Sequence, residues 1–134
     1  MKKAERDRVL NKTGGRCAYC GCILEKGWHV DEVEPCRRNF KYDSDKGKNL
    51  FDGTYMHPER VVFENQMPAC ASCNRLKSSQ PLEAFRSVIQ NFVNSLNTYT
   101  LQYKFAKRYG QIQETPKPIV FYFETLTPAN LSTK

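Results

Sequence analysis

The sequence lacks long apolar runs, internal repeats and low-complexity tracts. A helix that crosses a membrane needs about 20 consecutive apolar residues, so no membrane-spanning segment is expected. Residues 1–8 are mostly charged and no apolar stretch follows them, which is unlike a secretory signal. We therefore expect an intracellular, cytoplasmic protein, in a compartment that keeps thiols reduced.

Acidic residues are few relative to basic ones. The chain has 14 Asp and Glu against 21 Lys and Arg, a formal net charge of +7 and a pI of about 9.2. This excess favours a polyanionic partner, and DNA is the one expected. A membrane surface is disfavoured because the basic residues are spread along the chain. A length of 134 residues predicts one domain with a modest core.

Four of the six cysteines form two Cys-x-x-Cys pairs, Cys17 with Cys20 and Cys70 with Cys73. Two such pairs supply the four thiolates of a closed tetrahedral zinc site, because each pair sits on a tight turn that aims both sulfurs at one ion. A redox Cys-x-x-Cys is the weaker alternative for either pair. The remaining two cysteines fit neither pair and are expected to be free thiols: Cys22 and Cys36.

Turn residues and apolar spacing predict the elements around these pairs. A helix over residues 2–12 should stop at Gly14-Gly15. A short strand or hairpin is expected around Trp28–Val33, and a short helix should begin at the second pair and end near Lys77. The intervening polar residues 36–58 predict a long loop or a decorated hairpin, and residues 60–64 a strand or a turn of helix.

The remainder of the chain is expected to extend this core. Helical spacing of apolar residues predicts a helix from Pro81 to Leu96, with an apolar stripe that packs into the core and an interruption at Asn97-Thr98. A second helix should run over residues 101–109 and end at Gly110. The apolar run Ile119–Phe123 predicts a C-terminal strand.

An acidic run beginning at His29 lies between the cysteine pairs. In a strand, alternation places His29 and Asp31 on one face and Glu32 on the other, unless a bulge brings Asp31 and Glu32 to one site. Asn74 directly follows the last paired cysteine. Carboxylate and amide oxygens from Asp31 and Asn74 are hard ligands that suit Mg²⁺ or Mn²⁺, with waters left on the ion. Such an ion would act as a Lewis acid on a phosphodiester.

Together these residues resemble the HNH endonucleases, and most of all the small HNH proteins of bacteriophages and bacteria. The pattern comprises Cys-x-x-Cys, then Val30-Asp31-Glu32-Val33-Glu34-Pro35, then Asn65, and finally Cys-x-x-Cys-Asn-x-x-Lys ending at Lys77. It spans roughly residues 16–78, and several spaced residues match at once.

The resemblance implies an α+β fold with a ββα-metal (His-Me finger) core, followed by a helical extension over residues 79–134 that ends in the predicted strand. It implies that Asp31 and Asn74 bind one catalytic divalent ion. It also implies that Asn65 braces the hairpin or the scissile backbone, and that the four paired cysteines hold a structural Zn²⁺.

One position departs from the family pattern, because Glu32 stands where the family has the histidine that activates water. A neutral imidazole suits general-base chemistry near pH 7, whereas a carboxylate is a weaker base and repels a phosphodiester. Three outcomes follow. Glu32 is a working base, or His29 or, with a weaker claim, His57 replaces it, or catalysis has lapsed.

Basic residues with interleaved aromatic residues are candidates for nucleic-acid contacts. Lys46 and Lys48 belong to this set, with Phe40, Tyr42 and Tyr55 available for stacking. The alternative for each residue is an ordinary solvated surface. Arg75 and Lys77 are the strongest candidates because they lie beside the expected metal. The residues expected to contact phosphate are Arg37, Arg38, Lys41, Arg75 and Lys77.

The sequence thus predicts an endonuclease that hydrolyses DNA phosphodiester bonds with one divalent ion, and Glu32, His29 and Asn65 are its candidate catalytic residues. The runner-up is a catalytically lapsed protein of the same fold that binds DNA or a protein, for example a phage counter-defence factor. A zinc-finger regulator explains the cysteine pairs but not Asp31, Asn65 and Asn74 together.

Overall fold

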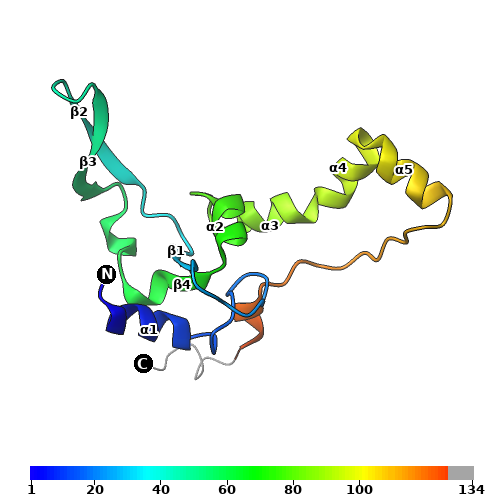
Figure 1. The fold of residues 1–134 in the computed structure, drawn as a ribbon, viewed down its shortest axis with the longest axis horizontal. Coiled ribbons are helices and arrows are strands. Elements are labelled where there is room, and N and C mark those ends of the chain that lie inside the picture. The colour runs from blue at the N-terminus through cyan, green and yellow to red at the C-terminus, as the bar shows by residue number, and fades with distance from the viewer. Residues whose placement is uncertain (127–134) are drawn as a thin grey trace. The chain divides into compact units, whose positions relative to one another are not determined.

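The computed structural model describes residues 1–126 and shows an α+β protein whose described part has five α-helices and two small antiparallel sheets (Figure 1). The chain divides into two compact units. Unit 1 contains residues 1–81 and the segment that begins at Phe121, and unit 2 contains Leu82–Val120. Over the described residues, no helix has both the length and the apolar character needed to cross a membrane.

The first helix of unit 1, α1, spans Lys3–Asn11 and confirms the predicted helix. Its Val9 side chain is fully buried. Gly14 and Gly15 follow with φ values of 59° and 84°. A side chain would strain this left-handed conformation, so the two glycines let the chain turn from α1 into the first cysteine pair.

Strand β1 (His29–Glu32) pairs antiparallel with β4 (Gln66–Ala69). The register runs without a shift and sets Asp31 opposite Met67. Met67 and Ala69 are buried, so this ladder forms part of the core of unit 1.

Strand β4 was not predicted, and residues 60–64 form no strand. Two 3₁₀ turns, Pro58–Arg60 and Phe63–Asn65, lead into β4 instead. Pro68 is unusual within a strand because it has no N–H to donate. The two-stranded ladder tolerates it, since its carbonyl points away from β1 and accepts the N–H of Ala18 at 2.8 Å.

The polar segment between β1 and β4 forms a hairpin, which decides between the two predicted alternatives. Strand β2 (Arg38–Asp43) pairs antiparallel with β3 (Lys48–Tyr55) (Figure 1). In the turn, the Asp43 carboxylate accepts the N–H groups of Asp45 and Lys46 at 2.9 and 3.3 Å. Such Asx-type hydrogen bonds fix the turn and thereby the register of the strands.

Helix α2 (Ala71–Lys77) begins at the second cysteine pair, as predicted. The Cys70 sulfur caps it by accepting the N–H of Cys73 at 3.3 Å. The helix ends at Ser78, whose φ of 52° is left-handed. Helix α2 packs against β1, so the helix lies next to the β1–β4 sheet.

The predicted strand over Ile119–Phe123 is wrong. The chain is extended up to Phe121 and then forms a 3₁₀ turn, Tyr122–Thr125. The N–H groups of Tyr122 and Phe123 donate to the carbonyls of Tyr19 and Ala18, at 3.1 and 2.8 Å. These N–H groups bind the turn that carries the first cysteine pair and not a neighbouring strand. The apolar run therefore packs against that turn and joins no sheet in the described part of the chain.

Unit 2 contains three short helices, α3 (Leu82–Gln90), α4 (Phe92–Tyr99) and α5 (Leu101–Arg108). The predicted longer helix is therefore interrupted at Asn91, and the next break falls at Thr100 instead of Asn97-Thr98. The break at Asn91 lies within the apolar repeat, so periodicity alone did not locate it.

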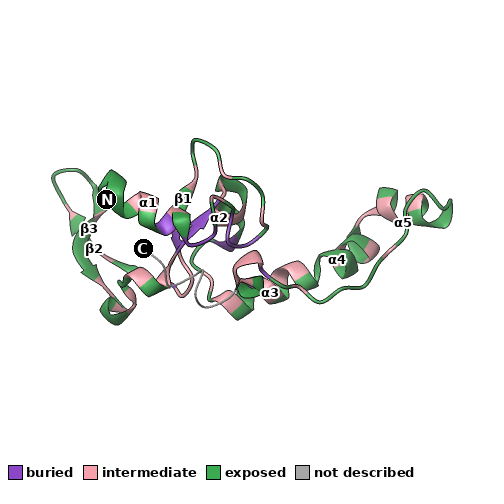
Figure 2. Cartoon of the chain, turned by 90° about the horizontal axis from the view of Figure 1, so that it is seen from below, coloured by how far each residue is buried: buried purple, intermediate pink, exposed green. Residues whose placement is uncertain are grey.

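The apolar stripe of unit 2 is mostly not core, contrary to the prediction. Phe85 is fully buried, but Phe92, Val93 and Leu96 are 41%, 43% and 37% exposed. Figure 2 shows buried residues gathered around β1 and α2, while α4 and α5 carry only intermediate and exposed ones. Short helices in a small unit leave too little neighbouring surface to cover every apolar side chain.

Candidate metal centre and adjoining acidic site

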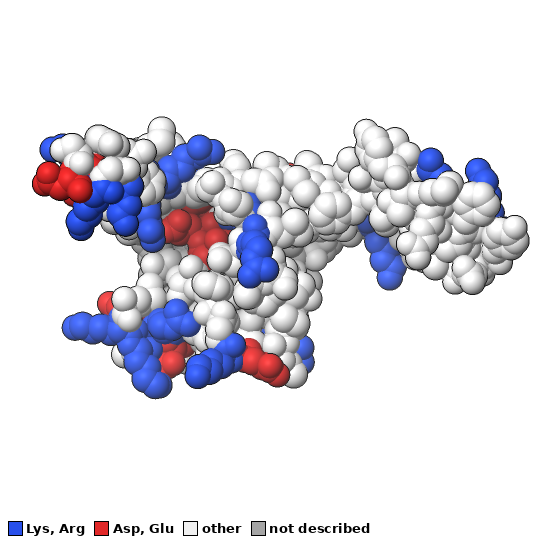
Figure 3. All heavy atoms as spheres, turned by 45° about the horizontal axis from the view of Figure 1, so that its top comes forward, with Lys and Arg blue, Asp and Glu red and all other residues white. Residues whose placement is uncertain are grey.

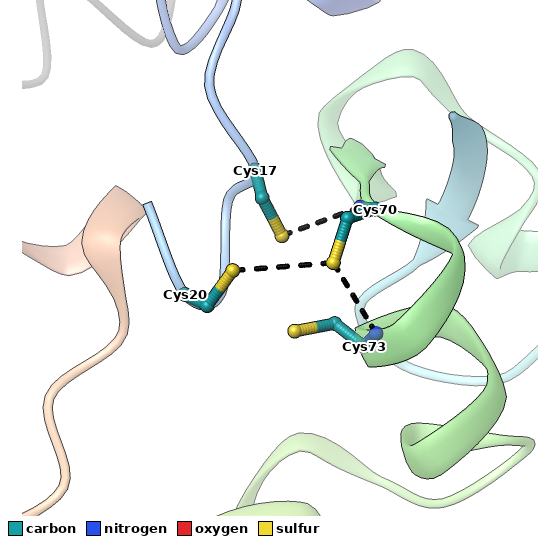
Figure 4. A group of neighbouring side chains, drawn as sticks. All are labelled: Cys17, Cys20, Cys70 and Cys73. Atoms are coloured by element: carbon teal, nitrogen blue, oxygen red, sulfur yellow. Dashed lines mark hydrogen bonds between the residues drawn. The ribbon is translucent and has the colours of Figure 1, made fainter. Parts of the chain in front are cut away.

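The four paired cysteines form one cluster. Their Sγ atoms all lie within 4.8 Å of one another, and those of Cys20 and Cys70 are 3.9 Å apart. Cys17 and Cys20 come from the first loop, and Cys70 and Cys73 from the start of α2, with all four sulfurs turned toward a common centre (Figure 4). The prediction that these four residues converge is confirmed.

Backbone hydrogen bonds shape both halves of this cluster. In the first loop, the N–H of Cys17 donates to the carbonyl of Cys22 at 2.8 Å, and that of Gly21 donates to the carbonyl of Cys17 at 2.9 Å. The N–H of Cys70 donates to the Cys17 sulfur at 3.4 Å and so links the two halves. The loop and the helix are thus locked together around the sulfurs.

The donor set fits a tetrahedral metal ion such as zinc. Zn–S bonds of about 2.3 Å in a tetrahedron place the sulfurs about 3.8 Å apart, close to the observed spacing. A hydrogen bond from Cys73 lowers the pKa of Cys17 to about 4, and the same contact raises the pKa of Cys73. Without a cation, crowded thiols ionise only in part, so a divalent ion is needed to hold all four as thiolates.

The two spare cysteines lie outside the four ligands. Cys22 is exposed, and the neighbouring sulfurs of Cys20 and Cys70 contribute to raising its pKa to about 12. Cys36 is buried, and burial together with the Glu32 carboxylate raises the pKa of its thiol. Both are free thiols, as predicted.

Asp31 lies next to this centre in a tight polar contact. Its Oδ2 accepts the Tyr19 hydroxyl at 2.5 Å and lies 3.1 Å from the Lys77 ammonium. Tyr19 belongs to the first cysteine loop and Lys77 to α2, so both halves of the cluster hold the same carboxylate. Burial and the nearby Asp31 carboxylate raise the pKa of Tyr19, which keeps the phenol protonated and able to donate.

The second oxygen of Asp31 is available. Both partners converge on Oδ2, and no described residue donates to Oδ1. Across residues 1–126, every side-chain oxygen or nitrogen that is shielded from solvent has a hydrogen-bond partner. Oδ1, which has none, therefore reaches solvent and is free to bind an ion or a water molecule.

Asn74 lies on the side of α2 that faces β1. It precedes Lys77 by three residues, so the two side chains share one helix face, and Lys77 reaches Asp31 from that face. Asn74 is half-buried, and its side-chain amide has no hydrogen-bond partner within the described part of the chain. Asp31 and Asn74 thus lie on two elements that pack against each other, β1 and α2.

The burial of Lys77 speaks against the predicted phosphate contact. It is 1% exposed, and besides Asp31 its ammonium donates to the Glu32 carbonyl at 2.7 Å. A buried ammonium that neutralises a carboxylate and binds the backbone of β1 is a positioning group. Sequence reasoning also missed Tyr19, whose only signal is a hydroxyl-bearing aromatic residue inside the first Cys-x-x-Cys.

The three candidate bases lie in different surroundings. His29 is exposed and two residues from Asp31 on the same face of β1. Glu32 is half-buried on the other face, where its carboxylate lies beside Cys36, and no bulge in the β1–β4 ladder turns it toward Asp31. The His57 ring lies 3.4 Å from the Glu59 carboxylate.

Asn65 braces the chain where it leaves β1. Its amide oxygen accepts the N–H of Glu34 at 2.9 Å, and its amide nitrogen donates to the carbonyls of Glu34 and Arg60 at 2.8 and 2.9 Å. All three hydrogen bonds are made to the backbone of Glu34 and Arg60, so Asn65 braces the chain at the end of β1, as the resemblance implies.

The other basic candidates are exposed. Arg37, Arg38 and Lys41 belong to the hairpin, and Arg75 lies on α2 beside Asn74. In the described residues none of the four forms an ion pair. Lys and Arg side chains cover more of the face shown in Figure 3 than Asp and Glu do. These cations are available to an anionic partner.

Comparison of the chain with protein-family models, with curated proteins and with solved structures gave no match. The cluster and the Asp31 carboxylate beside it are therefore the features that bear on function.

Replacing Lys77 with methionine is expected to lower the free energy of unfolding by about 3–5 kcal/mol, because it leaves the buried Asp31 carboxylate without its cation. Chemical denaturation of the zinc-loaded protein measures the change. Arg75→Met is the matched control on the same helix and is expected to change stability by less than about 0.5 kcal/mol. Equal effects of the two substitutions would contradict the positioning role of Lys77.

Proposed function

We propose that this chain is a metal-dependent endonuclease of the HNH type that hydrolyses DNA phosphodiester bonds. The observation that carries the proposal is the free Oδ1 of Asp31, whose carboxylate is held by contacts from both halves of the cysteine cluster and lies on the strand that packs against the helix of Asn74. In this proposal a structural Zn²⁺ binds the four paired cysteines. Asp31 and Asn74 hold one Mg²⁺ or Mn²⁺ ion.

Each neighbouring residue has a defined part in this proposal. Tyr19 and Lys77 fix the orientation of the Asp31 carboxylate by binding its Oδ2, so that Oδ1 stays directed at the ion. The bound ion supplies Lewis-acid stabilisation of the charge on the phosphodiester. Arg75 lies exposed on the same helix as Asn74 and contributes positive charge toward the DNA backbone.

The structure favours His29 over Glu32 as the group that takes a proton from the attacking water. His29 shares the face of Asp31 and is open to solvent, whereas Glu32 lies on the other face beside Cys36. The rise of a strand places alternate side chains about 7 Å apart, a distance that an ion on Asp31 together with one water bound to it would span.

Two substitutions separate the candidate bases. His29→Ala is expected to reduce the rate of nicking by about 100-fold or more, the usual contribution of a general base. Glu32→Ala is expected to reduce the rate by less than tenfold, because Glu32 then affects the site only by a small change in the position of β1. Single-turnover nicking of supercoiled plasmid with Mg²⁺ measures both rates. A larger loss for Glu32→Ala would assign the base to Glu32.

One observation favours the second candidate function, a catalytically lapsed DNA- or protein-binding adaptor such as a phage counter-defence factor. Lys77 already neutralises Asp31, which weakens the attraction of that carboxylate for a second cation. A nicking assay with Mg²⁺, Mn²⁺ or Ni²⁺ distinguishes the two functions. If the natural protein nicks DNA with none of these ions and Glu32→His creates nicking activity, the protein is the lapsed adaptor and not an endonuclease.

A further inference from the structure

One face of the β2–β3 hairpin carries aromatic rings that the protein does not bury. Residues opposite each other in an antiparallel pair share a face, so the register of Phe40 with Phe51 and of Tyr42 with Asn49 places these side chains together. Phe40, Tyr42 and Phe51 are 59%, 63% and 40% exposed. We call these three rings, with Tyr55 next to Phe51, the aromatic face.

Two of these rings also stabilise the hairpin, whereas Tyr42 does not. Phe51 contacts Phe40 and Tyr55 with ring centroids 6.4 and 5.3 Å apart, and the Arg38 guanidinium lies 5.2 Å from the Phe51 ring. Tyr42 is the most exposed of the three and has no ring partner within the described residues. Its ring is therefore available to a ligand.

The charges of the hairpin favour an anionic ligand. Residues 37–55 contain five basic and three acidic side chains, and none of these basic side chains forms an ion pair within the described chain. Two of the three carboxylates are used locally. Asp43 binds the N–H groups of its own turn, and Asp52 binds the N–H and hydroxyl of Thr54 at 2.7 and 2.6 Å.

Paired backbone connects the hairpin to the acidic site. The N–H groups of Met56 and His57 donate to the carbonyls of Arg37 and Cys36, at 2.8 and 3.0 Å, and continue the pairing below β2 and β3. Arg37 holds a φ of 55°, a left-handed conformation that is uncommon for a side chain of this size. The Asn65 side chain then links Glu34 and Arg60, the backbone positions on either side between this stem and the β1–β4 ladder.

We propose that the aromatic face stacks on unpaired bases of a nucleic-acid strand while the neighbouring cations bind its phosphates. Every base offers a flat π-face, but in a duplex these faces are covered by the adjacent base pairs, so exposed rings select single-stranded segments. Applied to the proposed endonuclease, on which this last step rests, the substrate is DNA that contains an unpaired segment near the cleaved bond.

The test measures binding apart from cleavage. The full, zinc-loaded chain is titrated without added Mg²⁺ or Mn²⁺ into a labelled dT₁₂ strand and, separately, into a duplex of 12 base pairs. We expect tighter binding of dT₁₂, and a loss of about tenfold for dT₁₂ with Tyr42→Thr, the effect typical of one base–aromatic stack. Threonine retains strand propensity at this exposed position. Tyr99→Thr, at a tyrosine of unit 2 that is 82% exposed, is the matched control and should change neither affinity.

A second variant detects the stacking itself. In Tyr42→Trp, the fluorescence of the new indole should be quenched by dT₁₂ but not by the duplex, with the natural protein as the blank for Trp28. The proposal is overturned if the duplex binds as tightly as dT₁₂, if Tyr42→Thr leaves dT₁₂ binding unchanged, or if the new indole is not quenched.

The binding result and the function proposed above can fail separately. If the protein nicks duplex DNA with a divalent metal and Tyr42→Thr nicks it at the same rate, the endonuclease is supported and the role of the aromatic face is overturned. A protein that cleaves nothing but binds dT₁₂ through Tyr42 would support the aromatic face and overturn the endonuclease.

Discussion

Replacing Asn74 with alanine should abolish metal-dependent nicking of supercoiled DNA, with a loss of more than about 100-fold in rate. The amide is one of two oxygen ligands proposed for the catalytic ion, and groups that only support such ligands already contribute 10- to 100-fold. Since this amide makes no hydrogen bond within residues 1–126, its removal should leave the fold intact. Asn74 therefore separates catalysis from stability more cleanly than Asp31 does.

Asp31→Ala should abolish nicking as well, but it also leaves the buried Lys77 ammonium without a carboxylate. We therefore expect this variant to lose stability, and its activity must be compared at a temperature where it is folded. Ser72→Ala, at an exposed position of α2, is the matched control and should nick at the natural rate.

Single-turnover cleavage with Mg²⁺, Mn²⁺ or Ni²⁺ measures the loss, and circular dichroism verifies the fold. If Asn74→Ala retains activity within about threefold of the natural protein, Asn74 is not a ligand and the proposed catalytic site is wrong. If both Asn74→Ala and Ser72→Ala are inactive, the loss comes from α2 and not from the ion.

Replacing Cys73 with serine should remove the structural metal and unfold unit 1. Few apolar side chains of unit 1 are fully buried, so a small core depends on the cluster that joins its first loop to α2. Binding of structural zinc in small domains is worth about 10–16 kcal/mol, which exceeds the stability of most domains of this size. Loss of one ligand should therefore eliminate the cooperative thermal transition of unit 1.

Elemental analysis should find one zinc per chain in the natural protein and much less in Cys73→Ser. Cys22→Ser is the matched control, because Cys22 is exposed and lies outside the four ligands, and it should retain one zinc per chain. A natural protein without bound metal, or a Cys73→Ser variant with unchanged melting, would contradict the structural role of the cluster.

Several elements could be predicted because their signals are local. The Cys-x-x-Cys spacing fixes two sulfurs on one turn, and the prediction that Cys17, Cys20, Cys70 and Cys73 converge is confirmed. Helix α1 and its glycine stop, strand β1 and helix α2 follow from neighbouring residues in the same way. In each case the deciding interactions lie within a few positions along the chain.

The errors share a different cause. Strand β4 was not predicted, and it contains Pro68, which is unfavourable in a strand in isolation but harmless on the outer side of a two-stranded ladder. The run at Ile119–Phe123 has strand composition, yet its N–H groups meet the carbonyls of the first cysteine loop and no strand. Both outcomes depended on a partner distant in sequence, which no local pattern specifies.

The sequence by itself determined the four thiols that cluster, the basic charge and the choice of Asp31 and Asn74 as proposed ligands, because these depend on residue type and spacing. Only the tertiary structure decided that Lys77 is buried against Asp31, that Tyr19 shares the same oxygen, and that no bulge in β1 turns Glu32 toward Asp31. The physical reason is that the residue type sets the charge of a side chain, whereas its burial and its partner depend on which distant elements pack against it.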